Sequence, residues 1–370
     1  MLRPSIGIDW DDVTAPFNSI AIRMANEKYH PEKPYRLEEI TSWANEGRTS
    51  VIKEFYNDPE LYSRQIPTEE TKRGIRRLMQ IADVFFITAV SPHFMGVRAE
   101  QIMTQFPELP PENIILGSAK DRVHFDIVLD DAIHNILDSK AEYPVLMRKP
   151  WNAKMTGLLS VNTMAEFVSL VRQIMKASTS KPEKITAPAV LALVGPSGSG
   201  ITEALCGSKG GNTTESISAE QLFVRPVNYC TEPERHGHRY VSEEAFDRMD
   251  FFEKTAYAGV RYGTRKEDIR ELLDQGKFAV IPVDMCGAIA MKRSFPTHII
   301  YVARDKEKLI ADIIESDYDT EEKTLRILSI DAEKRNRKIC DHVIHNDTIT
   351  SDFVSGAEEL RKLIMPESEK

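Results

Sequence analysis

Short, largely apolar runs recur along the chain, and those of the first half are each followed at once by a polar side chain. In the first half they occupy residues 6–8, 84–87 and 125–129, and in the second half residues 189–194. Apolar runs of this length are typical of strands that are buried on both faces, as in a parallel sheet. Longer segments with helical spacing separate them. The pattern therefore predicts an α/β protein built on parallel sheets.

The segment between the first two runs, residues 14–80, is too long for a simple connection inside a compact domain. Apolar residues recur at helical spacing from Phe17 to Met24. Thr68 precedes a second periodic segment, as an N-cap residue would. We predict that residues 14–80 form a helical cap, inserted between the first two strands.

Two carboxylates follow the first run. One residue separates Asp9 from Asp11, so the alternation of side chains along a strand points both toward the same edge of the sheet. Like charges this close need a counter-ion. A hard divalent cation such as Mg²⁺ takes oxygen ligands and keeps positions for a phosphate. The pair therefore indicates metal-assisted phosphoryl transfer.

Later runs supply partners for these carboxylates. Thr88 ends the second run and can donate to a phosphate, and Lys120 can neutralise an anionic transition state. Asp130 and Asp131 end the third run. Ligands of open parallel sheets bind beyond the carboxyl ends of the strands, so we expect these residues to converge on one crevice. Any one motif alone has an ordinary structural explanation, but the set in this order points to chemistry.

In order and spacing the four motifs resemble those of the haloacid dehalogenase (HAD) superfamily of aspartate-nucleophile phosphatases. The closer resemblance is to its cytosolic 5′-nucleotidase and deoxyribonucleotidase branch, because a Pro-aromatic-Asn element at residues 149–152 follows the last motif as a similar element does there. The resemblance covers about residues 1–175 and implies a Rossmannoid parallel sheet with a helical cap. Asp12 is a departure, since many relatives carry Gly at that position.

The resemblance implies a role for each motif residue. Asp9 would attack phosphorus to form an aspartyl-phosphate, and Asp11 would protonate the leaving oxygen and later activate water. Mg²⁺ would be held by Asp9, the backbone carbonyl of Asp11, and Asp130. Thr88 and Lys120 would grip the phosphoryl oxygens.

The likeness also implies that the cap closes over the substrate, a nucleoside monophosphate. Aromatic cap residues, Phe55 and Tyr56 among them, can stack on a base, but aromatics at helical spacing are also ordinary core residues. Both interpretations stay open at this point. The candidate substrate contacts are Phe17, Trp43, Ser91 and Asp131.

Composition fits an intracellular enzyme of two domains. With 370 residues the chain exceeds what one hydrophobic core usually supports. Its formal net charge of −9 speaks against a general nucleic-acid partner, which usually shows a basic face. The cysteines at 206, 230, 286 and 340 lack C-x-x-C spacing and are expected to be thiols of a reducing compartment. No signal peptide, lipidation motif or apolar run of membrane-spanning length appears, so we expect a cytoplasmic location without membrane contact.

Residues 177–187 break the hydrophobic pattern and are expected to be a linker between a first domain of residues 1–176 and a second of residues 188–370. The second domain opens with an apolar run and a glycine-rich turn from Gly195 to Thr202, which can form an anion-binding nest at a helix N-terminus. The general motif G-x-x-x-x-G-K-[ST] carries lysine where this chain has Ile201. The missing lysine is the charge that follows the β- and γ-phosphates during transfer.

The second half, about residues 188–366, resembles guanylate kinase, which implies a second α/β domain of P-loop type. From this likeness, the ligand of the second domain is expected to be either a nucleotide or a protein. The positions carried over to nucleotide binding are Gly195, Gly198, Gly200 and Thr202 in the turn, and Arg235, Glu253, Tyr262, Thr264 and Asp284 around the GMP site.

Three departures from guanylate kinase weaken the case for kinase chemistry. Ile201 replaces the P-loop lysine, Glu232 stands where an arginine would hold the nucleotide phosphate, and Ile327 replaces an arginine of the lid. Without these cations we do not expect phosphoryl transfer. The domain is then either a weakened nucleotide-binding module or a scaffold that uses the former GMP cleft for a protein partner. The retained residues can also persist merely as parts of the fold.

The leading hypothesis is a Mg²⁺-dependent phosphatase of nucleoside monophosphates, fused to a guanylate kinase-like domain that lacks kinase activity. An alternative, suggested by the order of the two domains, is a bifunctional polynucleotide kinase-phosphatase that processes strand ends. A third hypothesis is a non-catalytic, nucleotide-binding regulatory protein.

Overall fold

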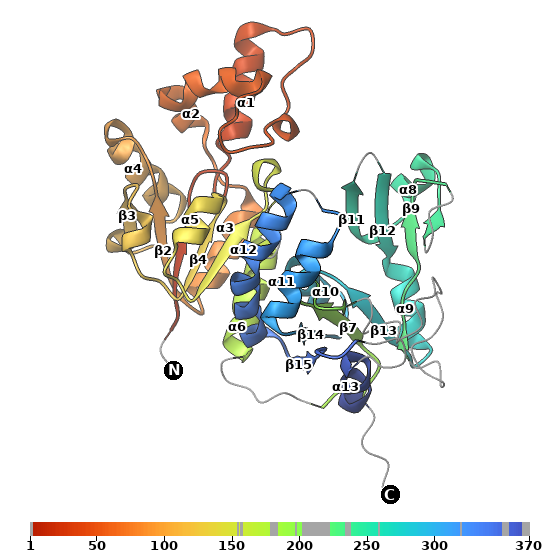
Figure 1. Ribbon diagram of the computed structural model, residues 1–370. Coiled ribbons are helices and arrows are strands. Elements are labelled where there is room, and N and C mark those ends of the chain that lie inside the picture. The colour runs from red at the N-terminus through yellow and green to blue at the C-terminus, as the bar shows by residue number, and fades with distance from the viewer. Residues whose placement is uncertain are drawn as a thin grey trace, which may run out of the picture. The chain divides into compact units, whose positions relative to one another are not determined.

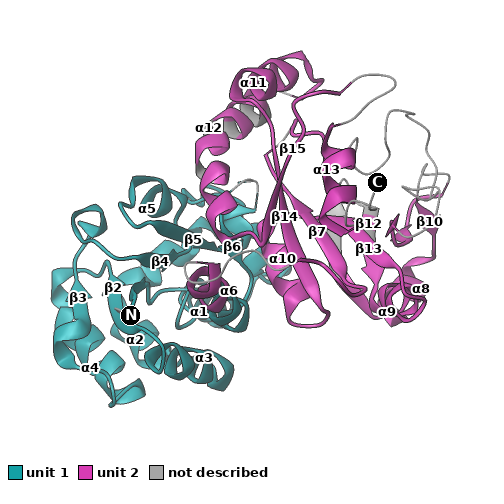
Figure 2. Ribbon diagram, turned by 90° about the horizontal axis from the view of Figure 1, so that it is seen from below, with its two compact units in different colours: residues 1–170 teal, residues 171–370 magenta. Residues whose placement is uncertain are grey.

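The computed structural model describes residues 3–153, 155, 158–177, 184–196, 198–201, 223–233, 238–257, 260–318, 320–349 and 355–364. They fall into two compact units, residues 1–170 and 171–370, and the division lies within helix α6 (Met164–Ala177) (Figure 2). Both units are α/β, as the apolar runs predict. Among the described helices, none combines the length and the apolar character needed to cross a membrane.

The first unit is built on a six-stranded sheet in the order β3-β2-β1-β4-β5-β6, and each neighbouring pair is parallel. The predicted strands at residues 6–8, 84–87 and 125–129 coincide with β1, β2 and β4. Strand β1 lies between β2 and β4, where the strand order reverses, and ligands of such sheets bind at that point. The strands are β1 Ser5–Ile8, β2 Asp83–Thr88, β3 Ile114–Leu116, β4 Ile127–Asp130, β5 Tyr143–Met147 and β6 Ser160–Val161.

Helices pack on this sheet where the spacing of apolar residues predicts them. Helix α3 (Glu69–Met79) begins after Thr68, whose side chain accepts a hydrogen bond from the N–H of Thr71 at 3.2 Å, which confirms the predicted N-cap. A Cβ atom on Gly74 would lie 2.5 Å from Cγ of Met164, so glycine allows α3 to approach α6 closely. The other helices are α4 Met95–Gln105 and α5 Ile133–Asp138, with short 3₁₀ turns at Pro92–Phe94, Pro111–Asn113, Lys120–Arg122 and Pro150–Asn152.

Between β1 and α3 the chain forms a lobe that projects from the sheet (Figure 1). It contains α1 (Asn18–Tyr29), α2 (Pro59–Arg64), and the 3₁₀ helices Leu37–Glu39 and Arg48–Asn57. Most residues of one apolar cluster belong to this cap, and among them Ile52 and Leu61 are fully buried; Trp151, outside the cap, joins the cluster. Phe55 belongs to the same cluster, so it is a core residue of the cap rather than a base contact.

The second unit contains two sheets. A five-stranded sheet in the order β15-β14-β7-β13-β8 has parallel neighbours throughout, and a four-stranded sheet has the order β10-β9-β12-β11. The run predicted at residues 189–194 is the central strand β7. The strands are β7 Val190–Val194, β8 Phe223–Val224, β9 Asn228–Cys230, β10 Arg239–Tyr240, β11 Phe251–Tyr257, β12 Val260–Arg265, β13 Phe278–Pro282, β14 Thr297–Ala303 and β15 His342–His345.

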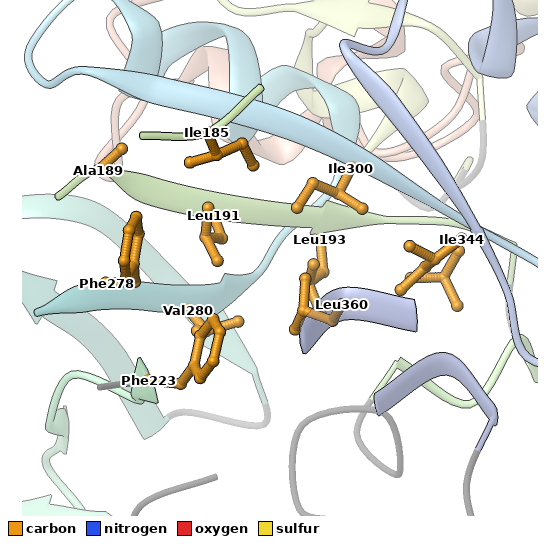
Figure 3. Close-up of a cluster of buried hydrophobic side chains, with 11 residues drawn as sticks. Ile185, Ala189, Leu191, Leu193, Phe223, Phe278, Val280, Ile300, Ile344 and Leu360 are labelled. Atoms are coloured by element: carbon orange, nitrogen blue, oxygen red, sulfur yellow. The ribbon is translucent and has the colours of Figure 1, made fainter. Parts of the chain in front are cut away.

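One face of the larger sheet carries a hydrophobic cluster of the second unit. Leu191 and Leu193 of β7 meet Val280 of β13, Ile300 of β14 and Ile344 of β15 (Figure 3). Burial of these side chains from water is the main source of stability for such a sheet. The helices are α8 Glu243–Arg248, α9 Lys266–Asp274, α10 Met285–Lys292, α11 Lys306–Glu315, α12 Thr320–Asn336 and α13 Ser355–Ile364, with a 3₁₀ turn at Arg337–Ile339.

Candidate active site

The carboxyl ends of β1 and β4 hold buried carboxylates side by side. Asp9 follows β1, and its N–H donates to the carbonyl of Leu129 at 2.9 Å, which extends the β1–β4 pairing up to Asp130. Asp131 comes next, and one carboxylate oxygen from each of the three acids lies within 4.8 Å of the others. The structure therefore brings Asp9 and Asp130 close enough to share a cation, and it adds Asp131 to the group. We call Asp9, Asp130 and Asp131 the acid cluster.

Lys120 lies between two members of the acid cluster. Its Nζ is 2.8 Å from Oδ1 of Asp9 and 2.6 Å from Oδ2 of Asp130. Burial alone would lower the pKa of Lys120, but the charges of Asp9 and Asp130 outweigh it and raise that pKa above its ordinary value. Burial raises the pKa of Asp9 to about 7, against the opposing effect of Lys120, and it also raises the pKa of Asp131. One lysine thus balances only part of the negative charge.

Residues that follow β4 hold Asp130 in place. The side-chain Nδ2 of Asn135 in α5 donates to both carboxylate oxygens of Asp130, at 3.0 and 3.1 Å. The N–H of Ala132 donates to Oδ1 of Asp130 at 2.9 Å. These bonds fix the orientation of a carboxylate that is almost completely buried.

The Pro-aromatic-Asn element holds Asp131 in place through hydrogen bonds. Nε1 of Trp151 donates to Oδ2 of Asp131 at 2.9 Å, and Nδ2 of Asn152 donates to the carbonyl of Asp131 at 2.9 Å. The same amide also donates to the carbonyl of Met147, at the end of β5, at 2.8 Å. This element therefore fastens the loop after β4 to the next strand.

Asp11 faces different partners. Its carboxylate forms an ion pair with Arg98 of α4 at 2.8 Å and accepts a hydrogen bond from Nε2 of Gln65 at 2.7 Å. Thr88, at the end of β2, is fully buried, and its hydroxyl accepts a hydrogen bond from Arg98 at 2.9 Å. The side chain of Asp11 is therefore engaged apart from the acid cluster.

Asp12 shows why glycine is common at its position. Its φ is 56°, in the left-handed region where glycine is favoured and where aspartate is among the better tolerated side chains. Its carboxylate accepts hydrogen bonds from the N–H groups of Phe17 and Asn18 at the start of α1, at 2.9 and 3.1 Å, and from Nδ2 of Asn18 at 2.8 Å. Asp12 thereby binds the first cap helix to the loop after β1.

A cavity of about 420 Å³ lies over these residues. Asp9, Asp11 and Lys120 line it, together with aromatic residues of the cap. Trp43 is 58 % exposed, and its ring centroid lies 5.1 Å from that of His134 in α5. The aromatic cap residues in the lining are Phe17, Trp43, Tyr56 and Tyr62.

Most of the predicted substrate and catalytic residues line this cavity. Ser91 and Asp131 do so, whereas Thr88 and Asp130 are buried outside the lining. The sequence reasoning missed other residues of the site. The lining residues it did not single out include Asn18, Asn57, Tyr62, His134 and Asn135, and the residues missed behind the lining are Gln65 and Arg98.

The glycine-rich turn of the second unit keeps the conformation that its glycines permit. Gly198 and Gly200 have φ values of 81° and 72°, in the left-handed region. A Cβ atom on Gly195 would lie 2.7 Å from the carbonyl oxygen of Val302, so glycine is required there too. Thr202 and Arg235, both predicted nucleotide contacts, lie outside the described residues.

The predicted GMP contacts are only partly described. Glu253 of β11 pairs opposite Thr264 of β12, and Tyr262 lies in the same strand as Thr264, but the side chains of Glu253 and Tyr262 lie outside the description. Asp284 is the N-cap of α10, where its Oδ1 accepts a hydrogen bond from the N–H of Gly287 at 2.7 Å. This capping bond gives Asp284 a structural reason to be present.

The two isoleucines that replace expected cations both pack on apolar residues. Ile201, at the lysine position of the turn, packs against the core cluster that includes Leu191 and Leu193. Ile327 of α12 packs against the cluster of Leu309, Ile313 and Ile330. Each of the two side chains therefore packs in the apolar cluster next to it.

Comparison with known families assigns the two halves of the chain to two different families. Residues 3–178 match the family of 5′ nucleotidase, deoxy (pyrimidine), cytosolic type C protein (NT5C). Residues 188–362 match the guanylate kinase family. The chain joins an NT5C-type domain to a guanylate kinase domain. This confirms both resemblances inferred from the motifs, and the NT5C-type domain is of the HAD type of phosphoric monoester hydrolases.

Individual relatives agree with this division. The NT5C-type domain is similar to a 5′(3′)-deoxyribonucleotidase of Bacillus subtilis, with 26% identity over 170 residues that cover 45% of this chain and 96% of the relative. The guanylate kinase domain is similar to guanylate kinases of Chlamydia trachomatis and Wolinella succinogenes, each 28% identical, over 40% and 43% of this chain and 76% of each relative.

Two solved structures resemble parts of the chain. A guanylate kinase from Anaplasma phagocytophilum is 18% identical, with a TM-score of 0.29, and covers 48% of this chain and 96% of its own. A haloacid dehalogenase-like hydrolase from Burkholderia xenovorans LB400 is 11% identical, with a TM-score of 0.31, and covers 45% of this chain and 96% of its own.

Proposed function

We propose that the NT5C-type domain is a Mg²⁺-dependent phosphatase of nucleoside monophosphates that works through an aspartyl-phosphate on Asp9. The observation that carries this proposal is the position of Asp9, beside Asp130 and Lys120, in the lining of a cavity that aromatic residues of the cap also line. A phosphate seated there meets a carboxylate nucleophile and a cation, while a base meets aromatic rings.

The acid cluster fits a hard divalent cation. All of its donor atoms are oxygens, they converge within 4.8 Å, and Lys120 leaves the cluster with net negative charge. Asp9 and Asp130, with the backbone carbonyl of Asp11, would hold Mg²⁺. When bound, Mg²⁺ would neutralise negative charge on the phosphoryl oxygens.

The chain's own groups carry out the rest of the proposed reaction. Asp9 attacks phosphorus, and Asp11, at the same strand end, gives a proton to the ester oxygen and later takes one from water. Lys120 lies 2.8 Å from Asp9, so it is within reach of a phosphoryl group bound to that carboxylate. The cap aromatics supply the surface for the base and exclude water from it.

Loss of the nucleophile tests this proposal directly. Phosphate release from a panel of ribo- and deoxyribonucleoside monophosphates is measured with Mg²⁺, for the wild type and for Asp9→Asn. We expect a loss of at least about 10⁴-fold, because covalent catalysis loses its whole route with its nucleophile. Chelation should stop the wild-type reaction, and added Mg²⁺ should restore it. Asp83→Asn, at an exposed ion pair with Arg3, is the matched control. Equal rates for the wild type and Asp9→Asn would end the proposal.

Substrate length separates this proposal from an end-processing enzyme. A cavity of about 420 Å³ is of the size that holds one small ligand, which favours a mononucleotide. We expect faster phosphate release from a nucleoside monophosphate than from an oligonucleotide with a terminal phosphate. A strong preference for the oligonucleotide would support the polynucleotide kinase-phosphatase alternative instead.

For the guanylate kinase domain we propose nucleotide binding without phosphoryl transfer. The left-handed glycines at Gly198 and Gly200 support binding, and the apolar packing of Ile201 and Ile327 argues against catalysis. Thermal unfolding of the full chain is measured with GMP, GDP and ATP, for the wild type and for Gly198→Ala. A nucleotide that binds the turn should raise the melting temperature with concentration in the wild type only. No response to any nucleotide would favour the protein-binding scaffold.

A further inference from the structure

Arg98 lies in α4, outside the motifs on which the proposed function depends, and its side chain is fully buried. A buried arginine persists only when its charge is paired and its N–H groups are bonded. Both conditions are met here. The acceptors are Gln101 for Nε at 3.2 Å, Asp11 and Thr88 for Nη1 at 3.1 and 2.9 Å, and Asp11 and Gln65 for Nη2 at 2.8 and 3.2 Å.

These bonds tie together segments that are far apart in the sequence. Asp11 follows β1, Thr88 ends β2, and Gln65 directly follows cap helix α2. Gln101, which holds Nε of Arg98, also donates to the backbone carbonyl of Tyr62 in α2. The guanidinium therefore connects two strand ends to the cap while staying out of the cavity lining.

The two carboxylate oxygens of Asp11 are held unequally. Oδ1 accepts two short hydrogen bonds, from Nη2 of Arg98 at 2.8 Å and from Nε2 of Gln65 at 2.7 Å. Among the described residues, Oδ2 accepts one longer bond, from Nη1 of Arg98 at 3.1 Å, and that nitrogen also donates to Thr88 at 2.9 Å. Oδ1 is therefore the fixed oxygen, whereas Oδ2 can exchange a proton and Nη1 still keeps an acceptor.

We propose that Arg98 is a positioning residue for phosphoryl transfer, which anchors Oδ1 of Asp11 together with Gln65 and leaves Oδ2 to handle the proton. This inference rests on the proposed phosphatase function. In the first step Asp9 bonds to phosphorus, the P–O ester bond breaks with its electron pair on the ester oxygen, and the Oδ2 proton passes to that oxygen. In the second step water attacks phosphorus and gives a proton to Oδ2, and Asp9 leaves as a carboxylate.

The geometry also orients Thr88. Its hydroxyl oxygen accepts a hydrogen bond from Arg98, so the hydroxyl hydrogen must point to a different acceptor. Arg98 thereby contacts two motif residues, but only Asp11 lines the cavity, so the effect of Arg98 on catalysis is expected through Asp11. A lysine could not do the same, because an ammonium group lacks the planar fork that spans both oxygens of a carboxylate.

The dependence on the leaving group tests this role. A nucleoside monophosphate has an alkyl ester oxygen that needs a proton to leave, whereas p-nitrophenyl phosphate has a leaving group that departs as the anion. We expect Arg98→Met to lower kcat/KM for the nucleoside monophosphate by about 100-fold and for p-nitrophenyl phosphate by no more than about threefold. Asp11→Asn should show the same split between the two substrates.

A double variant and two single variants complete the design. If Arg98 acts through Asp11, the double variant Asp11→Asn with Arg98→Met should lose no more than Asp11→Asn alone. Arg98→Lys should show the same substrate split with a smaller loss, and it answers the question if Arg98→Met does not fold. Arg76→Gln, at an exposed ion pair with Glu108, is the matched arginine control and should behave as the wild type.

The outcomes separate this inference from the proposed function. Equal losses on both substrates, or multiplied losses in the double variant, would make Arg98 a merely structural residue and leave the phosphatase intact. A wild type that releases phosphate from neither substrate, or an Asp9→Asn variant as active as the wild type, would instead overturn the phosphatase, and this inference with it.

Discussion

The two domains use the carboxyl ends of parallel strands in opposite ways. In the NT5C-type domain, the residues after β1, β2 and β4 present charged and polar groups to one another, and Lys120 joins two of the carboxylates directly. In the guanylate kinase domain, the turn after β7 carries Ile201 where the family likeness expects a lysine, and that side chain packs against an apolar cluster. A parallel sheet therefore keeps its form whether or not its strand ends carry chemistry.

The difference between the two domains also indicates which set of side chains lowers the stability of the fold. Buried carboxylates destabilise a fold unless cations and hydrogen bonds compensate them, so a set such as the acid cluster points to a use. An isoleucine that packs on a core needs no such use, since burial alone stabilises it. The phosphate chemistry of this chain is therefore expected in the first domain.

The largest expected effect on this comparison comes from removing Lys120, the lysine that pairs with the acid cluster. We expect Lys120→Met to lower phosphate release by about 10³-fold, because the charge that stabilises the transition state is lost. It should also lower the free energy of unfolding by about 3–5 kcal/mol, since Asp9 and Asp130 are then left without their shared partner. Steady-state kinetics and urea unfolding measure the two effects.

The control for Lys120→Met is Lys72→Met, which removes a lysine from a pair with exposed Glu69. It should change the free energy of unfolding by no more than about 1 kcal/mol. Mg²⁺ should recover part of the stability that Lys120→Met loses, because a divalent cation can lie between the same carboxylates. If Lys120→Met is as stable and as active as the wild type, the acid cluster is not the site.

The next prediction concerns the second domain, where Ile201→Lys restores the lysine of the glycine-rich turn. Ile201→Lys should leave phosphoryl transfer from ATP to GMP at background, because Glu232 and Ile327 still depart from the family pattern. It should lower the free energy of unfolding by about 1–2 kcal/mol, since an ammonium group replaces a side chain packed on the core. Ile201→Met is the apolar control. Kinase activity in Ile201→Lys would show that one charge was all that the domain lacked.

The smallest expected effect tests whether a raised pKa by itself marks a site. Glu333 of α12 is buried, and Ser329 donates to its Oε1 at 2.6 Å. Burial raises the pKa of Glu333 to about 7. Because this folded-state value lies above the unfolded one, the folded state binds the proton more tightly, and the contribution of Glu333 to stability falls as pH rises from about 4.5 to about 7.

The matching variant isolates this contribution. Between pH 5 and pH 7.5 the wild type should lose on the order of 1–2 kcal/mol of unfolding free energy relative to Glu333→Gln. Urea unfolding of the guanylate kinase domain at the two pH values measures the difference. A parallel pH dependence in both proteins would show that Glu333 does not carry the proton. Glu333→Gln should not alter phosphate release from nucleoside monophosphates.

The strand ends of the site could be predicted because local pattern and local chemistry coincide there. Asp9, Thr88 and Asp130 each follow an apolar run, and parallel strands bring such ends to one edge. The placement of Asp9 beside Asp130 follows from this rule alone. Asp131 was expected to contact substrate, and its place in the acid cluster was not anticipated, since adjacent residues of a strand usually face opposite sides.

Arg98 and Gln65 could not be found in this way. Arg98 lies in a helix, where an arginine is ordinarily exposed to solvent. Its burial depends on Gln65, which comes from the far end of the cap, so the signal exists only in the folded chain. The same holds for His134, which meets Trp43 of the cap only after both segments are in place.

Asp12 imposes two requirements on the loop that leads into the cap. Its backbone is left-handed, with a φ of 56°, and its carboxylate must reach the N–H groups of Phe17 and Asn18. Glycine meets only the first requirement, and glutamate is too long for the second. This crossing between sheet and cap is therefore stiff, and the second crossing is held as well, because Gln65 bonds both Asp11 and Arg98.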